Sequence, residues 1–94
     1  MAAGDQEPGA SRQITVTVRF FAAPREALGV SDLTLALPEG ATVADLIARL
    51  LADYPVLTVY ARFMNVAVNR AYTGVQTRLR HGDEVACLPP VGGG

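Results

Sequence analysis

The segment 14–20, which reads Ile-Thr-Val-Thr-Val-Arg-Phe, alternates strictly between apolar and polar side chains. Because successive side chains of a strand point to opposite faces of a sheet, this period of two predicts a half-buried strand. Residues 32–37 alternate in the same way before Pro38-Glu39-Gly40 breaks the pattern. A sheet with one apolar face needs a second layer to cover that face, so the rest of the chain must supply one.

The apolar period changes after Thr42, where we expect a helix to begin. Apolar residues now recur three and four positions apart, which places them in one stripe along a helix. The stripe comprises Val43, Leu46, Ile47, Leu50 and Leu51. Thr42 is the expected N-cap, with Asp45 three positions later as its capping-box partner. Pro55 forbids continuation past Tyr54, so this main helix ends there. Its apolar stripe is wide enough to cover one face of a small sheet.

The remaining segments complete an α+β layout. Residues 24–28 predict a short helical turn, 63–69 a third main strand and 72–80 an irregular stretch. Residues 80–83 predict a turn whose glycine is available for a positive φ, and 84–88 predict the last strand. This order predicts a mixed sheet of four or five strands on one main helix, with the first and last strands adjacent at its centre.

Length and composition indicate one small soluble domain. A chain of 94 residues cannot support two cores. We expect a flexible leader over 1–12, the folded domain over 13–88 and an extended tail over 89–94. With 50% hydrophobic and 18% charged residues the chain is not disordered, and its longest apolar stretches are far below the ~18 residues of a membrane span. The N-terminus lacks the features of a secretory signal, so we expect a cytoplasmic protein without membrane partners.

Charge and cysteine content exclude several kinds of partner and site. The net charge of −1 and the scattered basic residues argue against nucleic-acid binding. The single cysteine, Cys87, excludes an internal disulfide and a cysteine metal cluster, and no metal site is predicted. All eight basic residues are arginines. This reflects either codon preference or protection of an activated C-terminus from lysine amines.

The last residues, Leu88-Pro89-Pro90-Val91-Gly92-Gly93-Gly94, have two interpretations. Glycine is costly to order, so a terminal glycine run does not serve to stabilise a fold. A backbone without side chains can enter a narrow channel, and a terminal carboxylate is ionised and able to attack an activated phosphate. The alternative is a frayed end, since chain termini are commonly disordered.

Three segments together resemble the small subunit of molybdopterin synthase, a sulfur carrier with the ubiquitin-like β-grasp fold. They are Val16 to Ala22 with Arg25-Glu26 and Gly29 following, Val66 to Asn69, and Leu79 with His81 to Ala86 running into Pro89-Pro90-Val91 and the glycine pair. The chain departs from that family at two places. Cys87-Leu88 stands where aromatic residues are usual, and Gly92 stands where Ala, Ser or Thr is frequent.

The resemblance implies chemistry at the C-terminus, with Gly94 and Gly93 as the catalytic residues. An E1-like activating enzyme would use ATP and magnesium to adenylate the carboxylate of Gly94, and a sulfur donor protein would convert it to a thiocarboxylate. The loaded tail would enter the large catalytic subunit of a heterotetramer and deliver sulfur to a cyclic pterin precursor. Gly92 would line the passage with Gly93, while Pro89 and Pro90 would aim the arm. No permanently bound cofactor is implied.

The alternation of side chains between the two faces of the last strand, which we call side-chain parity, assigns further roles. Cys87 shares the face of Val85 and is expected in the core, whereas Leu88 lies on the opposite face. Leu88 is therefore the candidate hydrophobic partner contact, with Phe63 and Val91 as weaker candidates. His81 is expected to be a solvated turn residue rather than a ligand or base.

Other functions stay open at this point. A sulfur carrier for thiamine or cysteine synthesis ends in the same way, although Pro89-Pro90 favours the molybdenum pathway. A ubiquitin-like modifier would form isopeptides, and a plain interaction domain would have no chemistry at its tail. In the favoured case the chain is the sulfur-donor subunit of a sulfurtransferase complex and does not carry the catalytic pocket.

Overall fold

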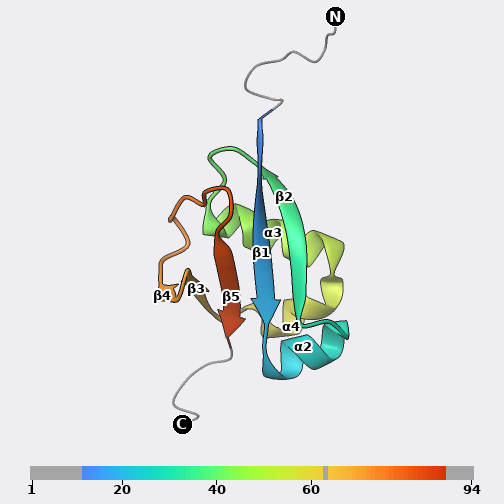
Figure 1. The fold of residues 1–94 in the computed structure, drawn as a ribbon. Helices are drawn as coiled ribbons and strands as arrows, with labels where there is room; N and C mark the ends of the chain where they lie inside the picture. The colour runs from blue at the N-terminus through green and yellow to red at the C-terminus, as the bar shows by residue number, and fades with distance from the viewer. Residues whose placement is uncertain (1–11, 63, 89–94) are drawn as a thin grey trace, which may run out of the picture.

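The computed structural model describes residues 12–62 and 64–88, which form a mixed sheet with helices over one face (Figure 1). The strands are β1 (Gln13–Phe20), β2 (Asp32–Pro38), β3 (Asn65–Val68), β4 (Ala71–Tyr72) and β5 (Glu84–Leu88). The helices are α2 (Ala22–Leu28), α3 (Val43–Asp53), the 3-10 helix η1 (Pro55–Leu57) and α4 (Thr58–Ala61). The sheet order β2-β1-β5-β3-β4 confirms the predicted α+β class and ubiquitin-like β-grasp fold.

The first and last strands lie side by side at the centre of the sheet, as predicted. β1 and β5 are parallel, and Val18 pairs with Val85 and Phe20 with Cys87. β2 flanks β1 and β3 flanks β5, both in antiparallel orientation. β5 therefore has a hydrogen-bonded neighbour on each side, which holds its carboxyl end at Leu88 firmly in the sheet.

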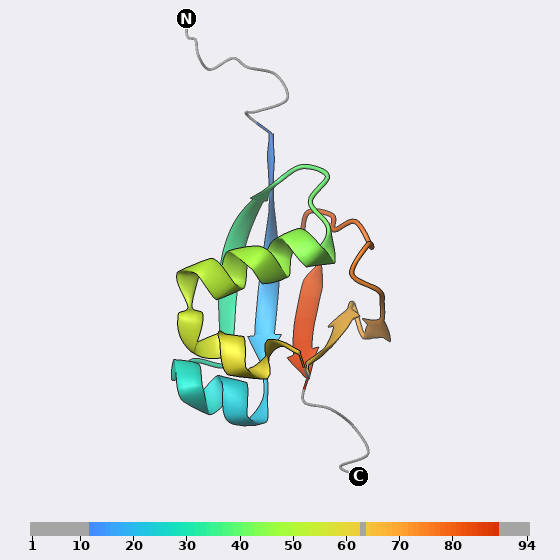
Figure 2. The same ribbon diagram turned by 180° about the vertical axis from the view of Figure 1, so that it is seen from behind.

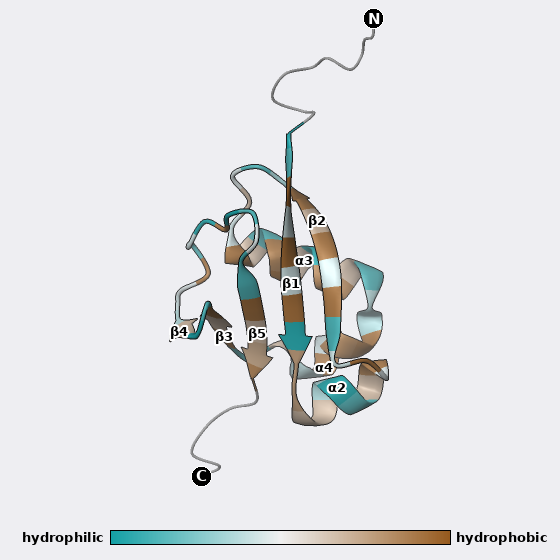
Figure 3. Cartoon of the chain, in the orientation of Figure 1, coloured by the Kyte–Doolittle hydropathy of each residue, from teal (hydrophilic) through white to brown (hydrophobic). Residues whose placement is uncertain are grey.

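The alternating strands bury one face, and the coloured bands of β1 and β2 in Figure 3 follow this alternation. All four apolar residues of β1 are buried, while Thr15 and Arg19 are exposed on the other face. β5 continues the core with two fully buried residues, Val85 and Cys87. The prediction that Cys87 packs in the core is confirmed.

α3 covers the apolar face of the sheet (Figure 2). Its N-terminus has the predicted capping box, in which Thr42 Oγ1 accepts from the Asp45 amide at 3.2 Å and Asp45 Oδ2 accepts from the Thr42 amide at 2.9 Å. The buried side chains of the stripe are those of Val43, Leu46 and Leu50. Ile47 and Leu51 pack at its edge and are partly buried.

The structure adds elements that the sequence pattern did not predict. After Pro55 stops α3, the chain continues through η1 and α4, and Leu57 of η1 enters the core. β4 overlaps the first residue of the stretch expected to be irregular, and it was not predicted because a strand of two residues is too short to show a period. The third strand begins at Asn65 rather than Phe63, and Phe63 lies outside the described residues.

None of the helices in the part of the chain that the structure describes has the length and hydrophobicity needed to span a membrane.

Candidate functional site

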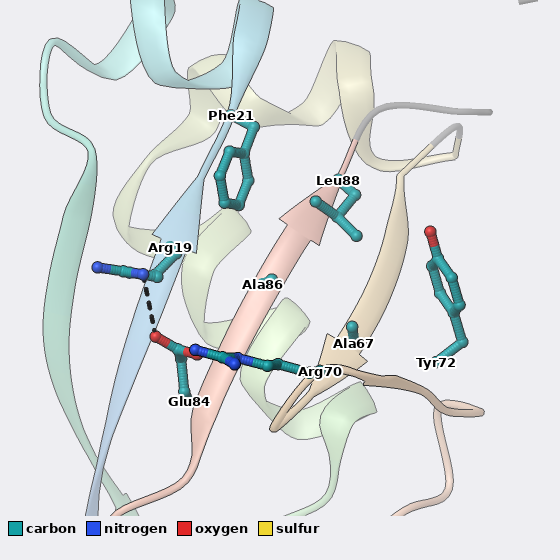
Figure 4. A pocket seen from close by; sticks show the side chains of 8 residues that line it. All are labelled: Arg19, Phe21, Ala67, Arg70, Tyr72, Glu84, Ala86 and Leu88. Carbon is teal, nitrogen blue, oxygen red and sulfur yellow. Dashed lines mark ion pairs between the residues drawn. The ribbon is translucent and has the colours of Figure 1, made fainter.

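The sheet face opposite α3 carries an open hollow of about 270 Å³ along β5, up to the carboxyl end of that strand (Figure 4). We call it the β5 hollow. It is lined by Arg19, Phe21, Ala67, Arg70, Tyr72, Glu84, Ala86 and Leu88. The side chains come from β1, β3, β4, β5 and the residues next to these strands, so the register of the sheet determines their arrangement.

Two alanines form the floor of the β5 hollow. Ala86 of β5 pairs with Arg19 on one side and with Ala67 on the other, and Ala67 pairs in turn with Tyr72. These four residues therefore form one row across the sheet, with small side chains in the middle and large ones at both ends. This difference in side-chain size produces the depression.

Apolar side chains rise beside this floor toward the end of β5. Phe20 pairs with Cys87, so the next residues of both segments, Phe21 and Leu88, come close together on the outer face (Figure 4). Leu88 is half-buried, Phe21 is 37% exposed and Tyr72 is 65% exposed. Two exposed aromatic rings and a leucine around one depression are typical of a surface that contacts another protein.

Three charged residues line the other end of the β5 hollow. The Arg19 guanidinium lies 3.2 Å from the Glu84 carboxylate, and both side chains are partly exposed. Such an exposed ion pair contributes at most about 1 kcal/mol to stability. Arg70 also extends toward Glu84 in Figure 4, but no ion pair within residues 12–62 and 64–88 includes it. Two arginines against one glutamate leave the hollow with an excess positive charge.

Cys87 is not suited to sulfur relay, although it is the one cysteine of the chain. Its side chain is fully buried, and burial raises the pKa of the thiol to about 11. The thiolate is the reactive form of cysteine, so this thiol is inert near neutral pH. Within the described residues, no three His, Cys, Asp or Glu side chains gather closely enough to hold a metal ion.

The predicted turn before β5, residues 80–83, is held in place by hydrogen bonds. Asp83 Oδ2 accepts a hydrogen bond from the Arg80 amide at 2.8 Å, and the amide of Gly82 donates to the Thr15 carbonyl at 2.8 Å. His81 is exposed in this turn, as expected, and its Nδ1 accepts from the Thr15 amide at 3.0 Å. These bonds connect the entry into β5 to β1.

One of the predicted site residues lies within the described part of the chain. Leu88 is on the outer face, as its parity predicted, and lines the β5 hollow. The other predicted site residues lie outside the described residues: Phe63, Pro89, Pro90, Val91, Gly92, Gly93 and Gly94.

Sequence reasoning missed Phe21 and Tyr72 as members of this surface. It considered Arg70, together with Arg62, Arg78 and Arg80, for contact with an acidic partner but favoured a solvated face for all four, and so did not place Arg70 here. For Phe21 a signal existed, because the alternation of β1 continued by one residue places Phe21 on the same face as Arg19. For Tyr72 and Arg70 no periodic pattern was available, because β4 has only two residues.

Comparison with known proteins connects this arrangement to a family. The ThiS family model matches residues 18–94 of the chain. The molybdopterin synthase sulfur carrier subunit of Chlamydomonas reinhardtii is 38% identical over 81 residues, which cover 84% of this chain and 98% of that protein. The protein of the same name from Mycobacterium tuberculosis is 35% identical over 82 residues, covering 86% and 99%.

Solved structures with the same fold include subunits of molybdopterin-converting factors and a small archaeal modifier protein. A putative molybdopterin converting factor subunit 1 from Pyrococcus furiosus has a TM-score of 0.76 at 34% identity and covers 83% of this chain and 99% of that one. Subunits 1 and 2 of the molybdopterin-converting factor from Helicobacter pylori form a complex, with a TM-score of 0.64, 26% identity and coverage of 86% and 100%. Small archaeal modifier protein 1 from Methanosarcina acetivorans has a TM-score of 0.74 at 31% identity and covers 89% and 100%.

Proposed function

The chain belongs to the ThiS family, and from this premise we propose that it is the sulfur carrier subunit of a molybdopterin synthase. The observation that carries the proposal is the 38% identity to a relative of that name, over 98% of the length of the relative. The complex of two converting-factor subunits from Helicobacter pylori supports a large subunit as the partner. The chain would supply the sulfur, and the partner would supply the pocket for the pterin precursor.

The proposed chemistry takes place at the carboxylate of Gly94, and the match to the family model extends to this residue. A carboxylate is a poor electrophile, so it must first be activated. An E1-like enzyme would use ATP and magnesium to form an acyl adenylate with release of pyrophosphate. The terminal sulfur of a persulfide on a sulfur donor protein would then displace AMP and form an acyl disulfide. A second thiol would cleave the S–S bond of this adduct, leaving the thiocarboxylate on Gly94 and a disulfide on the donor side. The proposal includes a cytoplasmic location, where ATP for this activation is available.

The β5 hollow is the proposed docking surface for both enzymes. From Leu88, the last described residue, the six residues 89–94 can span at most about 20 Å when fully extended. An enzyme that receives Gly94 in its active site must therefore contact the domain close to the end of β5. Because the activating enzyme and the large subunit need the same terminus, they would bind in turn and not together.

A ubiquitin-like modifier is the second candidate, and the likeness to small archaeal modifier protein 1 is the observation that favours it. A modifier would join its C-terminus to lysine amines of other proteins. A third role, sulfur supply for thiamine or cysteine synthesis, shares the thiocarboxylate and differs in the enzyme that receives it. The stable product formed at Gly94 separates the modifier from the two carriers.

Intact mass spectrometry tests the proposal directly. The full chain is incubated with its activating enzyme, ATP, magnesium and a sulfur donor. We expect the mass change for replacement of one oxygen by sulfur, and loss of this change when Gly94 is deleted. Cys87→Ala is the control, because a persulfide on the cysteine would add a sulfur atom without loss of oxygen. An unchanged mass in the presence of a competent activating enzyme would exclude the carrier function.

The second step is tested with the large subunit. The thiocarboxylated chain should convert the cyclic pterin precursor to molybdopterin when mixed with that subunit. Conversion of a thiazole precursor instead would favour the thiamine carrier. Covalent attachment of the chain to lysines of other proteins would favour the modifier.

A further inference from the structure

The turn between β3 and β4 has a backbone conformation that its sequence does not favour. Val68 pairs with Ala71, so the turn consists of Asn69 and Arg70. Both have positive φ, 51° and 74°. Two positive φ angles in a two-residue hairpin define a type I′ turn, in which asparagine is common first and glycine is preferred second. Arginine in second place is disfavoured, because its Cβ crowds the backbone in this region.

Asn69, the first residue of this turn, holds the turn in place. The amide of Asn69 donates to the Glu84 carbonyl at 2.8 Å, and Asn69 Oδ1 accepts from the Glu84 amide at 2.9 Å. Asn69 Nδ2 donates to Asp83 Oδ1 at 2.9 Å. Three hydrogen bonds therefore fix the residue before Arg70 to the start of β5, so the direction in which Arg70 leaves the backbone is also fixed.

The side chain that leaves this turn lies against the β5 hollow. Figure 4 shows Arg70 extending across the hollow toward Glu84, whose carboxylate already pairs with Arg19. Because this carboxylate is already paired with Arg19 and no ion pair within residues 12–62 and 64–88 includes Arg70, the positive charge of Arg70 has no carboxylate of its own in that part of the chain. A protein that covers the hollow would remove water from this charge.

We propose that Arg70 is a specificity-determining residue of the β5 hollow, which pairs with a carboxylate on the surface of the large subunit. The inference rests on the proposed function, since it takes that subunit as the partner. A guanidinium that loses its water must regain hydrogen bonds from an acceptor, and a carboxylate accepts two in parallel. A protein without an acidic group at this point would leave the charge unpaired and would be rejected. Backbone strain next to a surface hollow fits a residue retained for recognition.

The substitution Arg70→Gly separates recognition from folding, because the two effects have opposite signs. Glycine suits the second position of a type I′ turn, so the melting temperature should rise. Binding to the large subunit, measured by isothermal titration calorimetry, should weaken about tenfold. Arg70→Glu should weaken binding further, because it opposes the partner carboxylate with a like charge. A residue with a purely structural role would not give greater stability together with weaker binding.

The matched control is Arg78→Glu, which makes the same change of charge away from the hollow. Arg78 is exposed and does not line the β5 hollow. The affinity of the Arg78→Glu variant for the large subunit should stay within about twofold of wild type, as expected for an exposed charge outside the interface. The affinity of wild type should also fall more steeply with added salt than that of Arg70→Gly.

The outcomes separate this inference from the function on which it rests. If wild type binds the large subunit and Arg70→Gly binds equally well, the inference is wrong and the carrier function stands. The same conclusion follows if Arg70→Glu weakens binding no more than Arg78→Glu does. If wild type neither gains sulfur nor binds the large subunit, both fall. Recovery of Arg70→Glu binding by an acid-to-arginine substitution in the large subunit would identify the pairing carboxylate.

Discussion

The side-chain amide of Asn69 donates a hydrogen bond of 2.9 Å to Oδ1 of Asp83 and so joins the β3–β4 turn to the start of β5. The other Oδ of Asp83 accepts from the Arg80 amide at 2.8 Å. One carboxylate thus orders two turns that are far apart in sequence. Since residues from both segments line the β5 hollow, this contact connects the folding of the sheet to the shape of the proposed docking surface.

Replacement of Asn69 should destabilise the domain, through the loss of its side-chain hydrogen bonds and, for alanine, through strain at the positive φ. Asn69→Ala removes two side-chain hydrogen bonds and places a Cβ-bearing residue of low αL preference at φ 51°. We expect the free energy of unfolding to fall by about 1–3 kcal/mol in urea titrations. Asn69→Gly should cost less, because glycine tolerates the positive φ. Equal stability of Asn69→Ala and wild type would show that solvent replaces these bonds without cost.

Local periodicity predicted much of the fold, and side-chain parity predicted part of the site. The alternation of β1 and the stripe of α3 each have enough residues to define a period, and the Thr42 capping box is a local signal. Leu88 was placed correctly because parity relative to Val85 fixes its face. The position of Arg70 depends on a backbone conformation and a cross-sheet contact, and neither leaves a periodic trace in sequence.

Two leucine substitutions should separate the outer face from the core. Leu46→Ala removes a fully buried side chain from α3 and should lower the free energy of unfolding by about 2–5 kcal/mol. Leu88→Ala removes a half-buried side chain from the β5 hollow and should cost about 1 kcal/mol or less. Binding to the large subunit should nevertheless weaken for Leu88→Ala at temperatures where both proteins are folded.

One outcome of comparing Leu88→Ala with Leu46→Ala would contradict the proposed role of Leu88. If Leu88→Ala destabilises the fold as strongly as Leu46→Ala and leaves binding unchanged, then Leu88 is a core residue and not a partner contact. Chemical denaturation and calorimetry on the same preparations measure both quantities.

The buried thiol of Cys87 should make stability depend on pH in the alkaline range. Burial raises its pKa from the ordinary 9.0 to about 11. Between these values the thiol ionises in the unfolded chain but stays protonated in the folded one, so the unfolded state gains stability. The contribution is therefore complete below pH about 9 and is lost as the pH rises toward about 11, by about 2–3 kcal/mol.

Denaturation of wild type and Cys87→Ala over this pH range checks the effect. Both proteins share all other titrating groups, so the difference between their free energies of unfolding isolates Cys87. In the native state, iodoacetamide should not modify the thiol at neutral pH, whereas modification should follow unfolding. Rapid modification of the folded protein would contradict the burial of this thiol.

Gly82 and Gly74 form a matched pair that tests the turn before β5. Gly82 has φ 88°, whereas φ at Gly74 lies outside the left-handed region, and a Cβ at either position would meet no atom within 4 Å. Any difference between the two alanine variants is therefore conformational and not steric contact with neighbours. Gly82→Ala should lower the free energy of unfolding by about 1–2 kcal/mol, because an L residue is strained at this φ.

Gly74→Ala should leave stability unchanged or raise it by up to about 1 kcal/mol, because alanine restricts the unfolded chain. In a domain of this size, a change of 1 kcal/mol shifts the melting temperature by about 4–8 °C, which thermal unfolding resolves easily. The amide of Gly82 donates to the Thr15 carbonyl at 2.8 Å, so relaxation of the strained turn would also loosen the contact with β1. Equal melting temperatures for the two variants would mean that this turn adopts another conformation in solution.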